Sequence, residues 1–181
     1  TGPFLFTHHG VSGPAVFALS SLVAFEQYDA AHPLEITIDL CPDQSANALH
    51  DTITDHITAH PTKSFQNIIA TIIPKSLSEI CMRETSLPGA RRAAEVSTHD
   101  IFQAIAWLKT IPLHVIQRGA GDELITAGGI PLAEVNPSTM ESRMCPGLYF
   151  AGEILDVDGF TGGFNLQASW ATGRLVGLHV D

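Results

Sequence analysis

The hydrophobic pattern changes its period twice along the chain and so divides it into three parts. Between Leu34 and Leu40 apolar and polar residues alternate strictly, which predicts a half-exposed antiparallel strand. Over residues 45–110 the apolar positions recur instead at helical spacing. Beyond residue 111 short apolar runs return, separated by glycine and proline. The sequence therefore predicts a mixed α+β chain with a small helical subdomain between two β-rich segments.

Start and stop residues mark the helices of the segment 45–110. Ser45 is a candidate N-cap for the first helix, and Pro61 stops it. Ser97 and Asp100 have the spacing of a capping box for the last helix. Two more helices are expected between these, one over Phe65–Ile73 that ends at Pro74 and one around Leu77–Cys81 before Pro88.

The N-terminal segment predicts a strand, a turn and a buried helix. Phe4–Phe6 is a short apolar run, and the polar turn Thr7–Gly10 follows it. Ser12 is the expected N-cap of a helix that has Pro14 in its first turn, where the missing N–H costs nothing. The helix is apolar nearly all round from Ala15 to Phe25, so we expect it to be buried on several sides.

The C-terminal third combines short strands with a glycine-rich connection to a helix. Strands are expected at Pro112–Gln117, Leu124–Thr126, Pro131–Val135 and Leu148–Ala151, with a turn over 119–122. After the last strand come Gly152, Glu153 and Asp156, and a second glycine turn then opens the final helix. A helix N-terminus of this kind presents backbone N–H groups to an anionic or polar ligand. A carboxylate after the strand is suited to ribose or ribityl hydroxyls.

Composition excludes several classes of function. The chain of 181 residues carries 9 Lys and Arg against 19 Asp and Glu, a formal net charge of −10 that would repel a phosphate backbone, so no nucleic acid partner is expected. It holds no apolar run of about 20 residues, so we expect a soluble protein without a membrane span. Its three cysteines form no C-x-x-C pair, which favours a reducing, cytoplasmic setting.

Some histidines are weaker candidates for chemistry. His56 and His60 lie four residues apart on an expected helix but have no evident third ligand, so no metal site is expected. His8 and His9 precede the first expected helix and are weak catalytic candidates. No other residue stands out as a catalytic acid or base.

Residues 126–177 resemble the C-terminal part of the BaiN/YhiN-type flavoproteins, the FAD-dependent, NAD(P)-linked oxidoreductase family that includes aminoacetone oxidase. The stretch PGLYFAGEILDVDGFTGGFNLQASWATGRLVG, which begins at Pro146, carries most of the resemblance. Residues 6–15 resemble a T-H-x-G-x-S-G-P-A element of that family, and residues 73–77 resemble a motif of its helical insert. Phe160 and Phe164 depart from the family pattern, where tyrosine is frequent.

The resemblance implies a domain plan and a cofactor site. Residues 1–125 would form an inserted domain, β-barrel-like over 1–44 and 111–125 and helical over 45–110. Residues 126–181 would complete a two-dinucleotide-binding-type FAD domain. The implied cofactor-binding residues are Gly152, Glu153, Asp156, Gly162, Gly163, Asn165 and Leu166. Glu153 would reach the ribityl or pyrophosphate region, and the helix start would face the flavin ring; NAD(P)H is the implied reductant.

The family's N-terminal G-x-G-x-x-G turn is absent from these 181 residues. We therefore expect a C-terminal fragment whose partner is the missing N-terminal half of the flavoprotein, with a small organic molecule or oxygen as acceptor. Unpaired edges at 131–135 and 148–151 also predict a homodimer. The alternatives are a non-catalytic helical and β-barrel binding module that keeps a flavoprotein tail and, less favoured, a fumarate-reductase-type flavoprotein.

Overall fold

The computed structural model of the chain describes residues 1–119 and 126–180, and these form two compact units. Unit 1 combines Thr1–Gln27 with Arg118–Asp181, and unit 2 is Tyr28–Gln117. The turn predicted at 119–122 and the strand predicted at 124–126 lie outside the described residues, apart from Gly119 and Thr126. The division into inserted and C-terminal domains at residue 125 remains a prediction.

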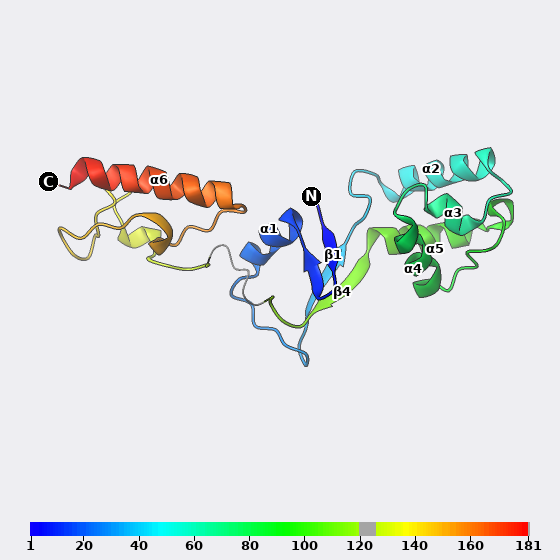
Figure 1. Ribbon diagram of the computed structural model, residues 1–181, viewed down its shortest axis with the longest axis horizontal. Helices are drawn as coiled ribbons and strands as arrows, with labels where there is room; N and C mark the ends of the chain where they lie inside the picture. Colours follow the sequence, from blue (N-terminus) through cyan, green and yellow to red (C-terminus); the bar gives the residue numbers. More distant parts are fainter. Residues whose placement is uncertain (120–125, 181) are drawn as a thin grey trace. The chain divides into compact units, whose positions relative to one another are not determined.

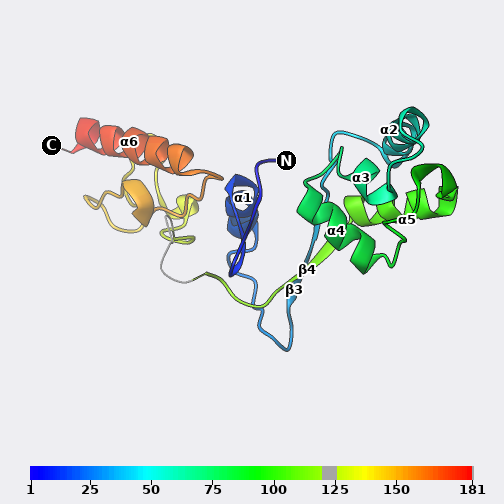
Figure 2. The ribbon, with the colours of Figure 1, turned by 45° about the vertical axis from the view of Figure 1, so that its right-hand side comes forward.

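Unit 2 is built on a helical core (Figure 2). Its helices are α2 (Ala46–Ala59), α3 (Phe65–Ile69), α4 (Lys75–Glu84) and α5 (Thr98–Lys109). A 3-10 turn, η1 (Ala93–Glu95), precedes α5. The fully buried side chains include Leu49, Ile53, Phe65, Ile68, Ile69, Cys81, Ala104 and Leu108. The helices predicted from the 3.6-residue period over 45–110 form as α2 to α5, although α3 ends at Ile69, short of the predicted Ile73.

The predicted caps of unit 2 form as hydrogen bonds. The Ser45 hydroxyl accepts the backbone N–H of Ala48 at 3.2 Å. Ser97 and Asp100 exchange two hydrogen bonds of 3.2 Å, side chain to backbone in both directions, which is a complete capping box. These hydrogen bonds with Ser97 lower the pKa of Asp100. The Arg91 guanidinium at 3.6 Å lowers it by a smaller amount.

An antiparallel ribbon leads into these helices. Strands β3 (Leu34–Ile38) and β4 (Ile111–Val115) pair in register from Leu34 opposite Val115 to Ile38 opposite Ile111. Leu34, Ile36 and Ile38 are half-buried and the residues between them are exposed, which confirms the predicted alternation. At the helical end the Lys109 ammonium contacts the Asp39 carboxylate at 2.5 Å and donates to the Cys41 carbonyl at 3.0 Å.

Unit 1 begins with a hairpin and helix α1. Strands β1 (Leu5–Thr7) and β2 (Gly10–Ser12) are antiparallel, with the turn at His8 and His9, and α1 spans Pro14–Leu22. The predicted Ser12 cap is wrong, because Gly13 is the N-cap and α1 has no side-chain cap. Gly13 has φ 104°, and a Cβ there would lie 2.9 Å from the Pro3 carbonyl oxygen, so only glycine fits. Pro14 at the first helical position is confirmed.

Helix α1 buries none of its residues among those described, so the predicted burial on several sides is wrong. The exposed fractions of Phe17 and Leu22 are 50% and 69%. The apolar residues around α1 predict packing on several sides. The described chain covers them only in part.

The C-terminal part of unit 1 is a helix with an irregular segment packed along it (Figure 1). It contains the 3-10 turns η2 (Leu132–Glu134) and η3 (Gly152–Ile154) and the helix α6 (Gly162–His179). Val135, Met140 and Leu155 form its small core, against which Leu175 and Val176 of α6 pack. The predicted final helix is confirmed.

The strands predicted at 131–135 and 148–151 do not form. The first segment is η2, and the two segments take part only in isolated bridges, Val135 with Ser142 and Glu141 with Tyr149. A strand needs a ladder of consecutive paired residues, and here each segment forms a single isolated bridge to the loop between them. The described strands make two separate two-stranded sheets, so the described residues do not confirm a barrel.

Candidate functional site

The start of α6 lies open at the end of the second glycine turn. Its N-cap, Thr161, provides no side-chain hydrogen bond to the first turn. A Cβ on Gly162 would have no atom within 4 Å, and one on Gly163 would meet only the Thr161 hydroxyl at 3.9 Å. Among described residues, no acceptor bonds the N–H groups of these two glycines. Two donors at the positive end of an 18-residue helix are therefore without an acceptor among the described residues.

A shallow hollow of about 330 Å³ adjoins these amides. It is lined by Thr161, Gly163, Phe164 and Gln167. The Phe164 ring is 66% exposed, so a flat aromatic surface borders the hydrogen-bond donors. The arrangement suits a planar ligand that carries acceptor atoms along one edge. Leu166, also predicted for the site, lies on the first turns of α6 and is exposed.

Asn165 holds the glycine turn in shape. Its side chain is only 4% exposed. The carboxamide oxygen accepts the N–H of Gly159 at 2.9 Å, and the amide nitrogen donates to the carbonyls of Gly159 at 3.0 Å and Thr161 at 3.1 Å. Both polar atoms of Asn165, which the resemblance placed among the cofactor contacts, are thus bonded to the turn before α6.

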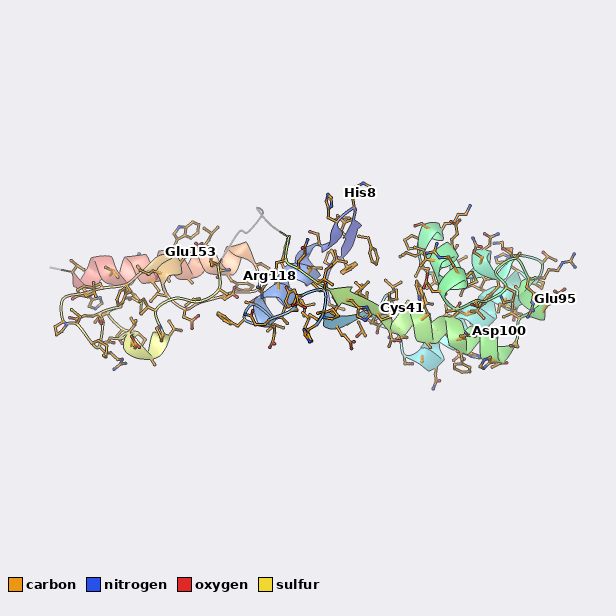
Figure 3. The ribbon with its side chains drawn as sticks, turned by 90° about the horizontal axis from the view of Figure 1, so that it is seen from below. His8, Cys41, Glu95, Asp100, Arg118 and Glu153 are labelled. Carbon is orange, nitrogen blue, oxygen red and sulfur yellow. The ribbon has the colours of Figure 1, made fainter. Side chains whose placement is uncertain are left out.

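Glu153 and Gly152 lie beside the middle of α6 and not at its start. The Gly152 N–H donates to the Thr172 hydroxyl at 3.0 Å, and Gly152 has φ 79°, which favours glycine. Thr172 is ten residues into α6, about 15 Å along the axis from Gly162 at a rise of about 1.5 Å per residue. The Glu153 carboxylate is exposed, and no described residue bonds it (Figure 3). The predicted site residues therefore form two groups along one helix.

Gly129 fixes the path of the segment that bears the carboxylates. Its neighbour Ile130 donates to the Ile154 carbonyl at 2.8 Å, and Asp156 donates back to the Ile130 carbonyl at 2.9 Å. The Asp156 side chain is exposed beside this pair. Gly128 and Gly129 were not among the predicted site residues, although a glycine pair beside a predicted strand is a signal of close backbone approach.

Helix α1 meets the same segment through Ser21. The Ser21 hydroxyl donates to the Asp158 carboxylate at 2.7 Å. The Arg118 guanidinium holds the end of α1 by donating to the carbonyls of Ala24 at 2.7 Å and Glu26 at 3.0 Å (Figure 3). No sequence signal points to the Ser21–Asp158 pair, because 137 residues separate its members.

The remaining candidates lie elsewhere in the described chain. His8, labelled in Figure 3, and His9 are exposed at the tip of the β1–β2 hairpin, and the described residues show no hydrogen bond or ion pair between either side chain and α6. Across residues 1–119 and 126–180 no three His, Cys, Asp or Glu side chains are grouped to hold a metal ion. Within the same ranges, no helix has both the length and the hydropathy to cross a membrane.

Relatives of known name match nearly all of this chain. A 3-dehydro-bile acid delta(4,6)-reductase of Clostridium scindens is 32% identical over 178 residues, 98% of this chain and 43% of the relative. A ribosomal RNA dihydrouridine synthase of Escherichia coli is 32% identical over 172 residues, 93% of this chain and 40% of the relative. One of the same name in Haemophilus influenzae is 29% identical over 180 residues. The chain thus spans about two fifths of the length of these relatives.

Residues 21–179 match the family described as the HI0933-like protein Rossmann domain. The match includes both groups of site residues along α6 as well as all of unit 2. It agrees in part with the resemblance drawn from the motifs, since that resemblance also pointed to flavoproteins. The chain belongs to the HI0933-like Rossmann-domain family, a family of FAD-binding flavoproteins.

Proposed function

We propose that this chain provides one face of the FAD site of an NAD(P)H-dependent reductase, and that a segment with a G-x-G-x-x-G turn provides the other. The observation that carries the proposal is the open start of α6, where two adjacent glycines leave two backbone donors without acceptors in the described chain. Among the described residues, no close contact requires glycine at either position. A ligand in close contact with the backbone would require it.

The residues present fit FAD in two places. The N–H groups of Gly162 and Gly163 would donate to acceptor atoms on the edge of the flavin ring, and the helix dipole would stabilise negative charge that develops there. The Glu153 carboxylate, beside the middle of α6, would accept hydrogen bonds from ribityl hydroxyls. FAD is a long molecule, and the separation of about 15 Å between the two groups suits contacts to two of its parts. The bound flavin would supply the hydride chemistry.

The names of the relatives support a reductive reaction. One is called a reductase. The other two are called dihydrouridine synthases, and dihydrouridine is a reduced form of uridine. NAD(P)H is the proposed reductant and a small organic molecule the proposed acceptor. The net charge of −10 favours a small molecule over an RNA, because a phosphate backbone would be repelled. RNA as substrate is nevertheless the second candidate, since the E. coli relative is as similar as the reductase.

The test uses the longest gene product that contains this chain, purified without added flavin. We expect a visible flavin absorption band, bleaching on addition of NADH or NADPH, and faster nicotinamide oxidation with small α,β-unsaturated carbonyl compounds. Turnover with ribosomal RNA and not with the small compounds would overturn the choice of substrate. A protein that takes up no flavin even from excess FAD would overturn the proposed function and favour the non-catalytic binding module.

A further inference from the structure

We propose that Ser21 and Asp158 are positioning residues that connect helix α1 to the turn before α6 and so hold the flavin-facing amides in place. The inference rests on the proposed function, because it concerns the same FAD site. Ser21 lies near the end of α1, and Asp158 opens the turn that leads through Gly159 and Thr161 to α6. Neither residue touches the proposed cofactor surface itself.

The contact is strong for its position. The Ser21 hydroxyl donates to Asp158 Oδ2 at 2.7 Å, and both residues are half-buried. Hydrogen bonds to an ionised acceptor are stronger than those between neutral groups. A serine on a helix can instead bond within its own helix, as the neighbouring Ser20 does. Its hydroxyl donates to the Phe17 carbonyl at 2.8 Å. Ser21 instead reaches a residue 137 positions away.

The turn receives support from two sides, and only one of them is local. From within, the buried Asn165 carboxamide bonds Gly159 and Thr161. From outside, Ser21 holds Asp158, which precedes Gly159. The turn is tightly packed, since a Cβ on Gly159 would lie 2.7 Å from the Phe164 Cβ. A shift at Asp158 is therefore passed along the turn to the first residues of α6.

A second contact places α1 against the same region. A Cβ added to Gly128 would lie 3.7 Å from the Phe25 ring, which follows α1. Gly129 next to it is in backbone contact with Ile154 and Leu155. The end of α1 and the residues after it thus approach the C-terminal part of unit 1 at two points, Ser21 at Asp158 and Phe25 near Gly128. Together these contacts make α1 the support on which the turn rests.

The experiment compares Ser21→Ala with Ser20→Ala in the longest gene product that contains this chain. Alanine is favoured in a helix, so both variants retain α1. In flavin-free protein, Ser21→Ala should speed hydrogen exchange at the bonded amides of Gly159, Phe164 and Asn165 by about tenfold, the factor that corresponds to about 1.4 kcal/mol. Ser20→Ala should leave that exchange unchanged. Ser21→Thr keeps a hydroxyl at this position, so its exchange should match that of the unaltered protein.

Two further readouts test the effect on the cofactor. Ser21→Ala should weaken FAD binding and lower the flavin midpoint potential, because less precisely held donors stabilise the reduced flavin less. Equal exchange in Ser21→Ala and Ser20→Ala would overturn the inference. Faster exchange with unchanged affinity and potential would overturn it too, since the turn would then not act on the cofactor. Failure of the unaltered protein to bind FAD would overturn the proposed function instead, and the flavin-free exchange distinguishes the two failures.

Discussion

Gly129 and Ile154 lie so close together that Gly129 has no room for a side chain. A Cβ on Gly129 would stand 2.5 Å from the Ile154 carbonyl oxygen and 2.9 Å from the Asp156 nitrogen. Gly129 also has φ 151°, a conformation that other residues rarely adopt. This contact sets the course of the chain through η3 and on to the carboxylates.

The close contact predicts that Gly129→Ala destabilises the protein. Overpacking and backbone strain together should lower the free energy of unfolding by about 3 kcal/mol, measured by urea denaturation. The matched control is Gly177→Ala in α6, where a Cβ has no atom within 4 Å and alanine should raise stability slightly. Equal changes in the free energy of unfolding for Gly129→Ala and Gly177→Ala would show that the backbone contact at Gly129 does not restrict the chain.

The open start of α6 predicts a selective effect of Gly162→Pro. Proline is tolerated at the first helical position, and Thr161 before it already has the extended backbone, φ −142° and ψ 159°, that a following proline requires. The substitution removes one donor without breaking the helix. FAD affinity should fall by about fivefold, equivalent to about 1 kcal/mol, and the flavin midpoint potential should fall as well.

Gly173→Ala, in the body of α6, is the control for that substitution. A Cβ there meets no atom within 4 Å, so flavin affinity and potential should stay at their original values. Circular dichroism should show the same helix content in both variants. Retention of full affinity and potential by Gly162→Pro would rule out its amide as a flavin contact.

The cysteines should differ sharply in reactivity. Burial raises the pKa of Cys81 to about 12, whereas Cys145 is exposed. Burial and the Asp39 carboxylate also raise the pKa of Cys41. At mildly alkaline pH, iodoacetamide should modify Cys145 first and leave Cys81 intact in folded protein, as peptide mass spectrometry would reveal. Rapid labelling of Cys81 would mean that the core of unit 2 opens readily.

Ionisation of the Cys81 thiol should lower the stability of the fold in alkaline solution. A pKa raised from 9.0 to about 12 means that the folded state holds the proton more tightly. The resulting stability is complete below pH 9 and is lost as the pH rises from 9 towards about 12. Urea unfolding of Cys81→Ala over that range should show a shallower alkaline loss than the original chain, and identical slopes would contradict the buried thiol.

At low pH the capping box should weaken. Hydrogen bonds from Ser97 lower the pKa of Asp100 below 3.8, so the carboxylate stabilises α5 above that pH and the effect is lost as the pH falls through the lower folded value. In Asp100→Asn, the capping-box amides of residues 97 and 100 should be less protected from exchange at neutral pH, and their protection relative to the intrinsic rate should no longer fall in acid. Ser97→Ala should act in the same direction, and slower exchange in either variant would be a contradiction.

Local patterns predicted local structure well. The strict alternation of Leu34–Leu40 predicted β3, and the spacing of Ser97 and Asp100 predicted the cap of α5, because both signals involve neighbouring residues. Prediction failed where a distant partner decides the outcome. The apolar runs 131–135 and 148–151 resemble strands, but each finds only one bridging partner. Ser12 suited a cap, yet only Gly13 has the backbone freedom required there.

The candidate site was predictable in its parts but not in its arrangement. The glycines and carboxylates of residues 152–166 stand out in the sequence, and family resemblance gave them provisional roles. The position of Gly152 beside Thr172, and of Ser21 beside Asp158, follows from packing between distant segments. The homodimer predicted from strand edges stays a prediction, although the strands on which it relied do not form.

The most direct test of the FAD site is amide hydrogen exchange of the flavoprotein with and without saturating FAD. The account predicts that FAD slows exchange most at residues 152–156 and 159–166, where the exposed carboxylate segment and the open start of α6 lie. Tight binding of FAD without slower exchange in these two segments, or with protection confined to residues 45–110, would contradict it.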